Sequence, residues 1–200
     1  MKIIEKINFV LNKPRTIILA GEGKEKGVLA TFQVLKPHFK IGKDVLVYSE
    51  DKKDLENFSF FVKKSSLPIL VVTNAGLIPK ESILFSGEEE KLSFAREISK
   101  VLPSQGYLIL NFDDETARAI KKETSANVIT FGFSEMADFH VSDINQNGGV
   151  NFKINYKGNI VPMWLEGEFS KENIYAAAAA ACCGLVLGLN LVEISQSLKS

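Results

Sequence analysis

The chain contains 200 residues, and its 24 Lys and Arg residues balance its 24 Asp and Glu residues, so the formal net charge is zero. A neutral chain gives no electrostatic reason to expect a nucleic-acid partner, which needs a basic face. Apolar residues make up 46% of the sequence. This length and composition predict one domain, 1–200, with a large core and a short N-terminal extension at 1–13.

The cysteines and the apolar runs of the sequence indicate in which cellular compartment the protein is expected. The only cysteines, Cys182 and Cys183, are adjacent, so they cannot build a disulfide framework. We therefore expect a cytoplasmic protein. Residues 173–192 carry no charge, but an alanine run and two glycines favour a buried helix over a membrane span, and no membrane partner is expected.

In chain order, an amphipathic helix at 2–11 precedes a series of apolar segments that alternate with helical patterns. Five of these segments are predicted strands, at 16–20, 44–48, 68–73, 106–111 and 127–131. Helices are predicted between them: one at 26–34, one around 55–62, one after a capping box of Ser86 and Glu89, and one that Asp113 or Asp114 caps and that ends near Lys122. Continuous apolar strands between helices predict a parallel sheet covered on both faces.

The pattern changes at 138–165, where no helical period is present. Short strands separated by glycine turns at 147–149 and 157–159 predict an antiparallel meander, with Trp164 in the core. Helices at 170–187 and 191–199 follow; Gly188 ends the first, and Asn190 with Glu193 caps the second. The predicted fold class is α/β, a three-layer, P-loop-like, mostly parallel sheet with helices on both faces and this small meander.

A glycine-rich turn between the first strand and its helix is the main candidate binding site. Gly21, Gly23, Lys24, Lys26 and Gly27 are arranged like a phosphate-binding loop, in which a lysine meets the phosphates and a following Ser or Thr holds Mg²⁺. Here no hydroxyl follows either lysine. The turn is therefore either an anion cradle at a helix N-terminus or a turn that keeps its glycines for backbone shape alone.

The same glycines allow a nicotinamide-binding interpretation. Gly21, Gly23 and Gly27 are a loose variant of the dinucleotide fingerprint, and Glu50 or Asp51 follows the second strand, where an acid would bind a ribose. This interpretation makes the chain an NAD(P)-binding, Rossmann-like protein, and we keep it as a second alternative.

Other polar residues have structural explanations. Asp113 and Asp114 form either a catalytic carboxylate pair or a helix cap, and the cap is the commoner role after a strand. Arg96 lies on a patterned helix, where it pairs either with a phosphate or with a neighbouring acid, and we favour the salt bridge. His38 and His140 have no cysteine or carboxylate at ligand spacing, so we predict no metal site and no catalytic residue.

An ordered set of segments resembles the central, ATP-binding domain of the Mur ligases, which join amino acids to a nucleotide-linked muramyl acid in peptidoglycan synthesis. Folylpolyglutamate synthetases are similar to them. The segments are the glycine turn at 21–27, Thr73-Asn74-Ala75-Gly76, Ala95-Arg96-Glu97-Ile98, Asn111-Phe112-Asp113-Asp114 and Glu172-Asn173-Ile174-Tyr175-Ala176. The resemblance covers nearly all of the chain and implies that Asn111 and Asn173 contact a nucleotide.

The chain departs from the family pattern at chemical positions. The family loop, Gly-Thr-x-Gly-Lys-Thr-Thr, has no counterpart of its threonines here. A family magnesium ligand falls near Ser49 or Glu50, a family histidine near Pro79, and the second asparagine of the adenine segment on Ala176. The lysine that carries a carbamate in the family falls on Arg96, and an arginine stays protonated and cannot carry one.

The resemblance with these departures predicts a degenerate central-domain relative without the family's N- and C-terminal domains. We expect a pseudoenzyme that acts as a binding or scaffold module, with a protein partner or a homo-oligomer. ATP binding is expected to be weak or absent, and the expected Mg²⁺ ligands are missing. The alternative is an ATP-dependent acid–amino acid ligase, or one part of a split ligase.

Overall fold

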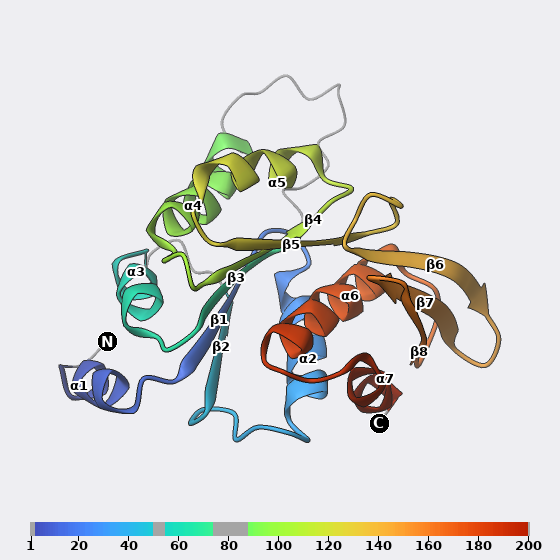
Figure 1. Cartoon of the computed structure of the whole chain (residues 1–200), viewed down its shortest axis with the longest axis horizontal. Coiled ribbons are helices and arrows are strands. Elements are labelled where there is room, and N and C mark those ends of the chain that lie inside the picture. The colour runs from blue at the N-terminus through green and yellow to red at the C-terminus, as the bar shows by residue number, and fades with distance from the viewer. Residues whose placement is uncertain (1–2, 50–54, 74–87, 200) are drawn as a thin grey trace.

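The structure, a computed structural model, describes residues 3–49, 55–73 and 88–199. An eight-stranded sheet crosses this part of the chain in the order β2-β1-β3-β4-β5-β6-β7-β8 (Figure 1). The strands lie at or close to their predicted positions: β1 (Arg15–Ala20), β2 (Val45–Ser49), β3 (Pro68–Val72), β4 (Tyr107–Asn111), β5 (Asn127–Gly132), β6 (Phe139–Gln146), β7 (Val150–Tyr156) and β8 (Asn159–Leu165).

The first five strands pair in parallel, as their continuous apolar sequences predict. Side chains that alternate along each strand enter two separate cores, one on each face. Ile17, Ile69 and Ile109 belong to one core, and the residues next to them, such as Ile18 and Leu70, belong to the other. All five are fully buried, so neither face of the parallel sheet is open to water.

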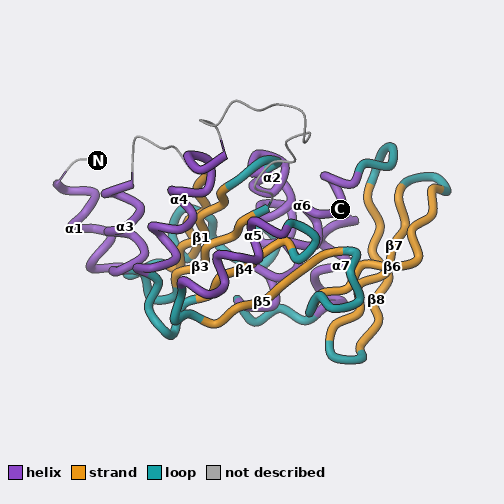
Figure 2. Tube along the Cα trace, turned by 90° about the horizontal axis from the view of Figure 1, so that it is seen from above, coloured by secondary structure: helices purple, strands orange, loops and turns teal. Residues whose placement is uncertain are grey.

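Helices cover both faces and complete the three layers (Figures 1 and 2). The first core takes side chains from α2 (Lys24–Leu35), α6 (Lys171–Val186) and α7 (Leu191–Lys199). The second core takes side chains from α1 (Ile3–Asn12), α3 (Leu55–Lys64), α4 (Glu88–Val101) and α5 (Glu115–Ile120), which continues into a short 3₁₀ turn, η2 (Lys121–Glu123). The predicted three-layer α/β fold is therefore confirmed.

The predicted meander is present, and it belongs to the same sheet. β6, β7 and β8 pair in an antiparallel manner, with glycines at positive φ in both connecting turns. β6 also pairs in parallel with the end of β5, through Phe131 with Phe139 and Gly132 with His140. Figure 2 shows these three strands at the opposite end of the molecule from α1.

Several local predictions need correction. α2 begins at Lys24 rather than Lys26, so both lysines lie in its first turn. Trp164, predicted to lie in the core, is half-buried and lines a surface hollow. α1 forms as predicted, but it buries Phe9 and leaves Ile7 and Val10 exposed. Ser86, of the predicted capping box, lies outside the described residues.

The alanine-rich helix α6 is a buried helix, as predicted. Ala176 through Cys183 are all buried, and the small side chains let α6 pack closely on α2 and the sheet. Complete burial raises the pKa of the Cys183 thiol to about 12, and burial next to Cys183 raises that of Cys182. Among the described residues, no helix has the length and apolar character that crossing a membrane requires.

The capping predictions for the last helix and for α5 hold. Asn190 Oδ1 accepts hydrogen bonds from the backbone N–H groups of Val192 and Glu193, and Glu193 Oε2 accepts one from Asn190 N–H. Asp114 caps α5 by accepting from Thr116 and Ala117 N–H. These bonds satisfy N–H groups that have no partner inside a helix.

Candidate functional site

The glycine turn lies where the direction of the chain connections reverses. β1 continues into α2 on one face of the sheet, while the neighbouring strand β3 leads toward α4 on the other face. In open α/β sheets, ligands bind at such a point, beyond the carboxyl ends of the strands. We call this end of β1, β3, β4 and β5 the carboxyl edge. It brings together the glycine turn, Thr73, Asn111 and the start of α6.

Backbone shape and close packing explain the three glycines. Gly21 and Gly23 have φ of 95° and 75°, and Gly23 is the N-cap of α2. A Cβ on Gly27 would lie 2.7 Å from Leu19 Cδ2, so glycine lets α2 pack against β1. Thr73 Oγ1 is shared between the carbonyl oxygens of Ala20 and Glu22, and it ties the turn to the end of β3. These contacts hold the turn's shape without a ligand.

The two candidate lysines have different surroundings. Lys26 Nζ lies 2.6 Å from Glu172 Oε2, so an ion pair joins the first turn of α2 to the first turn of α6. Lys24 lies one residue after the Gly23 cap. The hollow between the glycine turn, Thr73 and α6 measures only about 30 Å³. A space of this size holds a water molecule or two, and a triphosphate needs far more.

A hydrogen-bonded cluster closes the rest of the carboxyl edge. Asn111 is fully buried, and its Oδ1 accepts from Asp113 N–H. Asp113 accepts from the backbone N–H groups of Phe133 and Ser134 and from the hydroxyl of Tyr175, at 2.6, 3.0 and 3.0 Å. Asp113 therefore fixes the loop between β5 and β6 rather than capping α5. Its carboxylate also lies within 2.8 Å of where a Cβ on Gly132 would be.

Tyr175 is the residue of this site that sequence reasoning missed. Its ring packs on Phe133, with the ring centroids 4.9 Å apart. Desolvation by burial and the nearby Asp113 carboxylate raise its pKa well above that of a free tyrosine, so it is neutral and donates to Asp113 at ordinary pH. The available signal was its place in the sequence, three residues after Glu172 in the segment that begins α6. This end of α6 lies against the glycine turn.

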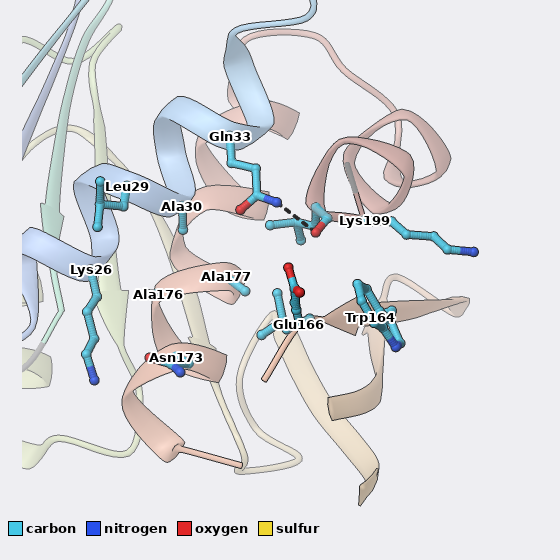
Figure 3. A pocket seen from close by; sticks show the side chains of 12 residues that line it. Lys26, Leu29, Ala30, Gln33, Trp164, Glu166, Asn173, Ala176, Ala177 and Lys199 are labelled. Atoms are coloured by element: carbon cyan, nitrogen blue, oxygen red, sulfur yellow. Dashed lines mark hydrogen bonds between the residues drawn. The ribbon is translucent and has the colours of Figure 1, made fainter. Parts of the chain in front are cut away.

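Asn173 lines a different hollow, of about 290 Å³, between α2, α6, α7 and β8 (Figure 3). Ala30, Ala176 and Ala177 line it with small side chains, and Trp164 stands on the β8 side. Lys26 lines this hollow, and its ion-pair partner Glu172 lines the smaller one beside the glycine turn. The structure therefore brings Gly21, Gly23, Lys24, Lys26, Gly27 and Asn111 to the carboxyl edge and places Asn173 beside it.

The described residues do not match the requirements of a magnesium–triphosphate site. The region around the turn adds carboxylates from Glu22, Glu25 and Glu172, which oppose a phosphate. No serine or threonine follows Lys24 or Lys26. No group of three or more His, Cys, Asp or Glu side chains in the described ranges is placed to hold a metal ion. Glu50 and Asp51, the ribose candidates, and Pro79 lie outside those ranges.

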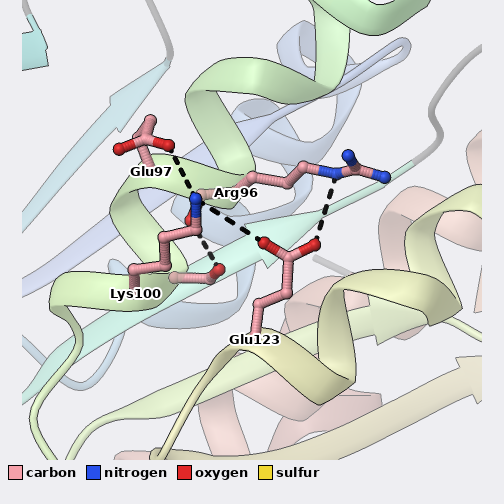
Figure 4. Close-up of polar contacts among 5 residues, drawn as sticks. Arg96, Glu97, Lys100 and Glu123 are labelled. Atoms are coloured by element: carbon pink, nitrogen blue, oxygen red, sulfur yellow. Dashed lines mark hydrogen bonds and ion pairs between the residues drawn. The ribbon is translucent and has the colours of Figure 1, made fainter.

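Arg96 takes part in a contact between helices (Figure 4). Its Nε lies 3.5 Å from Glu123 Oε1, and Lys100 Nζ lies 2.8 Å from Glu97 Oε1 and 3.8 Å from Glu123 Oε2. The hydrogen bond and charge of Glu97 raise the pKa of Lys100. The network links α4 to η2, as the salt-bridge interpretation predicted.

The fold and this edge define a class: a three-layer α/β domain with a P-loop-like glycine turn at its switch point. The family model for the "Mur ligase middle domain" matches residues 85–181. The chain is therefore similar to the Mur ligase middle domain in sequence over these residues.

Curated relatives agree with this assignment. UDP-N-acetylmuramate–L-alanine ligase from Hydrogenobaculum sp. is 29% identical over 205 residues, covering 99% of this chain and 41% of the relative. The enzyme of the same name from Aquifex aeolicus is 28% identical over 186 residues, covering 92% of this chain and 37% of the relative. The chain spans less than half the length of either relative.

Solved structures share the fold. MurF from Acinetobacter baumannii superimposes with a TM-score of 0.79 at 16% identity, over 98% of this chain and 47% of that one. MurF ligase from Thermotoga maritima, solved in complex with ADP, gives a TM-score of 0.72 at 16% identity, over 96% of this chain and 49% of that one. At these identities the likeness concerns the fold alone.

Proposed function

We propose that this chain is a Mur ligase middle-domain relative that no longer performs magnesium–nucleotide chemistry and acts as a binding or scaffold module. The observation that carries the proposal is the ion pair between Lys26 and Glu172, in front of a hollow of about 30 Å³. A lysine that would meet phosphates is instead neutralised by the neighbouring helix.

Electrostatics supports this interpretation. A triphosphate carries several negative charges, and it would meet the carboxylates of Glu22, Glu25 and Glu172 around the two lysines. Like charges repel. The hydroxyl that holds Mg²⁺ in a phosphate-binding loop, and so relieves this repulsion, follows neither Lys24 nor Lys26. The turn keeps its shape through internal hydrogen bonds, so the fold does not require a ligand there.

A second candidate function is an ATP-dependent ligase, or one part of a split ligase. The preserved geometry of the glycine turn at the N-terminus of α2 favours it, since this geometry suits an anion. In that case, residues outside the described ranges, or groups from another chain, would supply the magnesium ligands. Acyl-phosphate chemistry also needs its reactants held and water excluded.

Calorimetric titration of the purified chain with ATP, with and without Mg²⁺ and with NADPH as a control, tests the proposal. We expect no binding heat at concentrations that would saturate a micromolar site. Magnesium-dependent, micromolar ATP binding would overturn the proposal in favour of the ligase, and a preference for NADPH would favour the dinucleotide interpretation.

A pair of variants locates the cause of weak binding. If the carboxylates exclude the nucleotide, Glu22→Gln combined with Glu172→Gln should bind ATP more tightly than the unchanged chain. Lys24→Ala in the same background should remove that gain. Glu166→Gln is the matched control, because Glu166 lines the neighbouring hollow instead. The expected cytoplasmic location stays a prediction and is consistent with the two free, buried thiols.

A further inference from the structure

Exposed lysines gather where the parallel strands begin, at the end of the sheet opposite the glycine turn. We call this end the amino edge. Six exposed lysines lie on the segments leading into β1, β2 and β3: Lys13, Lys36, Lys40, Lys43, Lys63 and Lys64. None forms an ion pair with a residue that the structure describes. In a chain of zero net charge, this edge is locally basic.

Helix dipoles explain only part of this cluster. Lys36, Lys63 and Lys64 stand at the C-terminal ends of α2 and α3, where a positive charge is stabilising. Lys40 and Lys43 lie in the loop before β2, where no helix ends, and the carboxylate of Asp44 in that loop accepts a hydrogen bond from the Lys40 backbone. The two loop lysines therefore add a charge that local structure does not require.

A groove of about 360 Å³ lies beside these lysines, between α1, α3 and the edge strand β2. Phe9, Phe61, Leu46 and Tyr48 provide its apolar surface, and the rings of Tyr48 and Phe61 stack with centroids 4.9 Å apart and planes within 6°. Asn8, Asn12 and Lys43 add polar groups. An apolar, aromatic floor with a polar rim is the usual form of a protein docking pocket.

Exposed apolar side chains of α1 continue this surface. Ile7, Val10 and Leu11 are 53%, 37% and 75% exposed, while Phe9 is the helix's buried anchor. Ile7 and Leu11 are four residues apart, so they form a ridge along one side of the helix. Figure 1 shows α1 and the α2–β2 loop on the same, lower side of the molecule.

We propose that the groove, the ridge and the lysines together bind an acidic protein segment that carries a large apolar anchor residue. The anchor fills the aromatic groove, the ridge covers the segment's apolar side, and the acidic residues face the lysines. Charge complementarity selects this occupant. The proposal names the kind of partner for the scaffold role proposed above, and it uses the edge opposite the nucleotide site.

Other occupants fit the observations less well. Two copies meeting through this face would bring their lysines together, which is repulsive. A flat lipid surface would leave a concave groove unfilled. A strand added from a partner would need the free backbone groups on the outer side of β2. One of them is already used, since Gly42 N–H donates to Val45 O at 2.9 Å.

Selection of a phage-displayed library of random twelve-residue peptides on the intact chain tests the proposal. We expect enriched peptides to combine Asp or Glu with Leu, Phe or Trp. A synthetic, fluorescently labelled copy of an enriched peptide is then titrated by anisotropy. Leu11→Ser, and Lys40→Glu combined with Lys43→Glu, should each weaken its binding by about tenfold or more, and added salt should weaken it further.

Two matched controls make the test specific to this face. Val192→Ser removes an apolar side chain that is 54% exposed on α7, and Lys171→Glu reverses an exposed charge at the carboxyl edge. Both should change the affinity by less than about twofold. Circular dichroism confirms that each variant is folded. All five substitutions in these four variants are at exposed positions, so folding should be retained.

Several results would overturn the proposal. One is that the selected peptides are not enriched in Asp or Glu. Another is that Leu11→Ser binds the labelled peptide as tightly as the control variants do. A third is that the unchanged chain is a dimer and Leu11→Ser dissociates it. The chain is also sedimented with phosphatidylglycerol vesicles. If the unchanged chain sediments with them and the Leu11→Ser variant does not, the face binds lipid instead. ATP titration reports on the other edge, so failure here is distinguishable from failure of the proposed function.

Discussion

The carboxyl and amino edges of the parallel sheet use their polar residues in opposite ways. At the carboxyl edge, Lys26 pairs with Glu172, and Asp113 with Tyr175, and the hollow beside the glycine turn is about 30 Å³. At the amino edge, six lysines make no described ion pair, and the groove measures about 360 Å³. Among the described residues, side chains of the chain itself occupy the edge at which open α/β sheets bind ligands, while the opposite edge carries an open groove.

This contrast is the one that the proposed scaffold role predicts. Internal contacts of the glycine turn, through Thr73 and Gly27, hold its backbone shape. Backbone shape depends on glycines and close packing, whereas phosphate binding depends on which charges face the turn. A few changes of charged residues can therefore remove binding and leave the fold unchanged.

The largest expected effect tests how tightly the carboxyl edge is packed. Gly27→Val should destabilise the chain by about 3 kcal/mol, because its Cβ would lie 2.7 Å from Leu19 Cδ2 in a fully packed core. Urea unfolding measures the change. Gly23→Asn is the control: Gly23 has φ of 75° and open space around it, and asparagine tolerates this backbone, so the cost should stay below about 1 kcal/mol. If the two variants have the same free energy of unfolding, α2 does not pack against β1 as closely as described.

The next effect distinguishes two neighbouring carboxylates. Asp113→Ala should cost about 2 kcal/mol, since it removes the acceptor of three hydrogen bonds and frees the loop after β5. Asp114→Ala removes only the cap of α5 and should cost about 1 kcal/mol. Chemical denaturation of both variants gives the order. A larger cost for Asp114→Ala would contradict the role assigned to Asp113.

Sequence reasoning succeeded where one local pattern decides one structure. Apolar strands such as 68–73, the Asn190–Glu193 cap and the buried alanine helix follow from hydrophobic period and capping chemistry within a few residues. The parallel orientation of the first five strands was also predicted, because continuous apolar strands that alternate with helices are typical of a parallel sheet covered on both faces.

The site was predicted less completely, because its contacts join distant segments. The pair of Lys26 with Glu172 spans 146 positions, and that of Tyr175 with Asp113 spans 62. No local pattern shows such pairs. Trp164 was misplaced for a similar reason: β8 is an edge strand with one open side, so an apolar strand sequence does not require full burial.

A smaller effect appears in alkaline solution. Burial and Asp113 raise the folded-state pKa of Tyr175 above its ordinary value of 10. The unfolded chain then ionises first, so the stabilisation is complete below pH 10 and is lost as the pH rises above it. Because Tyr175 is partly exposed, the loss by about pH 11 should stay under about 1 kcal/mol.

Tyr175→Phe should remove this part of the alkaline decline. Thermal unfolding at several pH values from about 9 to 11 measures it. Tyr107→Phe is a suitable control, since Tyr107 begins β4 at the amino edge, the opposite end of the strand from Asp113. If the stability of Tyr175→Phe depends on pH as that of the unchanged chain does, the Tyr175 hydroxyl is not held by Asp113. The ion pair of Lys26 with Glu172 would then remain as a described side-chain contact that joins α6 to the carboxyl edge.

The smallest effect concerns the Arg96 network. Arg96 and Glu123 side chains are 43% and 29% exposed, and ion pairs near the surface contribute little, because water screens them and long side chains lose freedom when paired. Arg96→Met should therefore cost about 0.5 kcal/mol or less, and a double-mutant cycle with Glu123→Gln should give a coupling below about 1 kcal/mol. Urea unfolding at low and high salt measures both. A coupling that exceeds the cost of Asp113→Ala would show that α4 and η2, rather than the cluster at the carboxyl edge, hold the most stabilising polar contact of this domain.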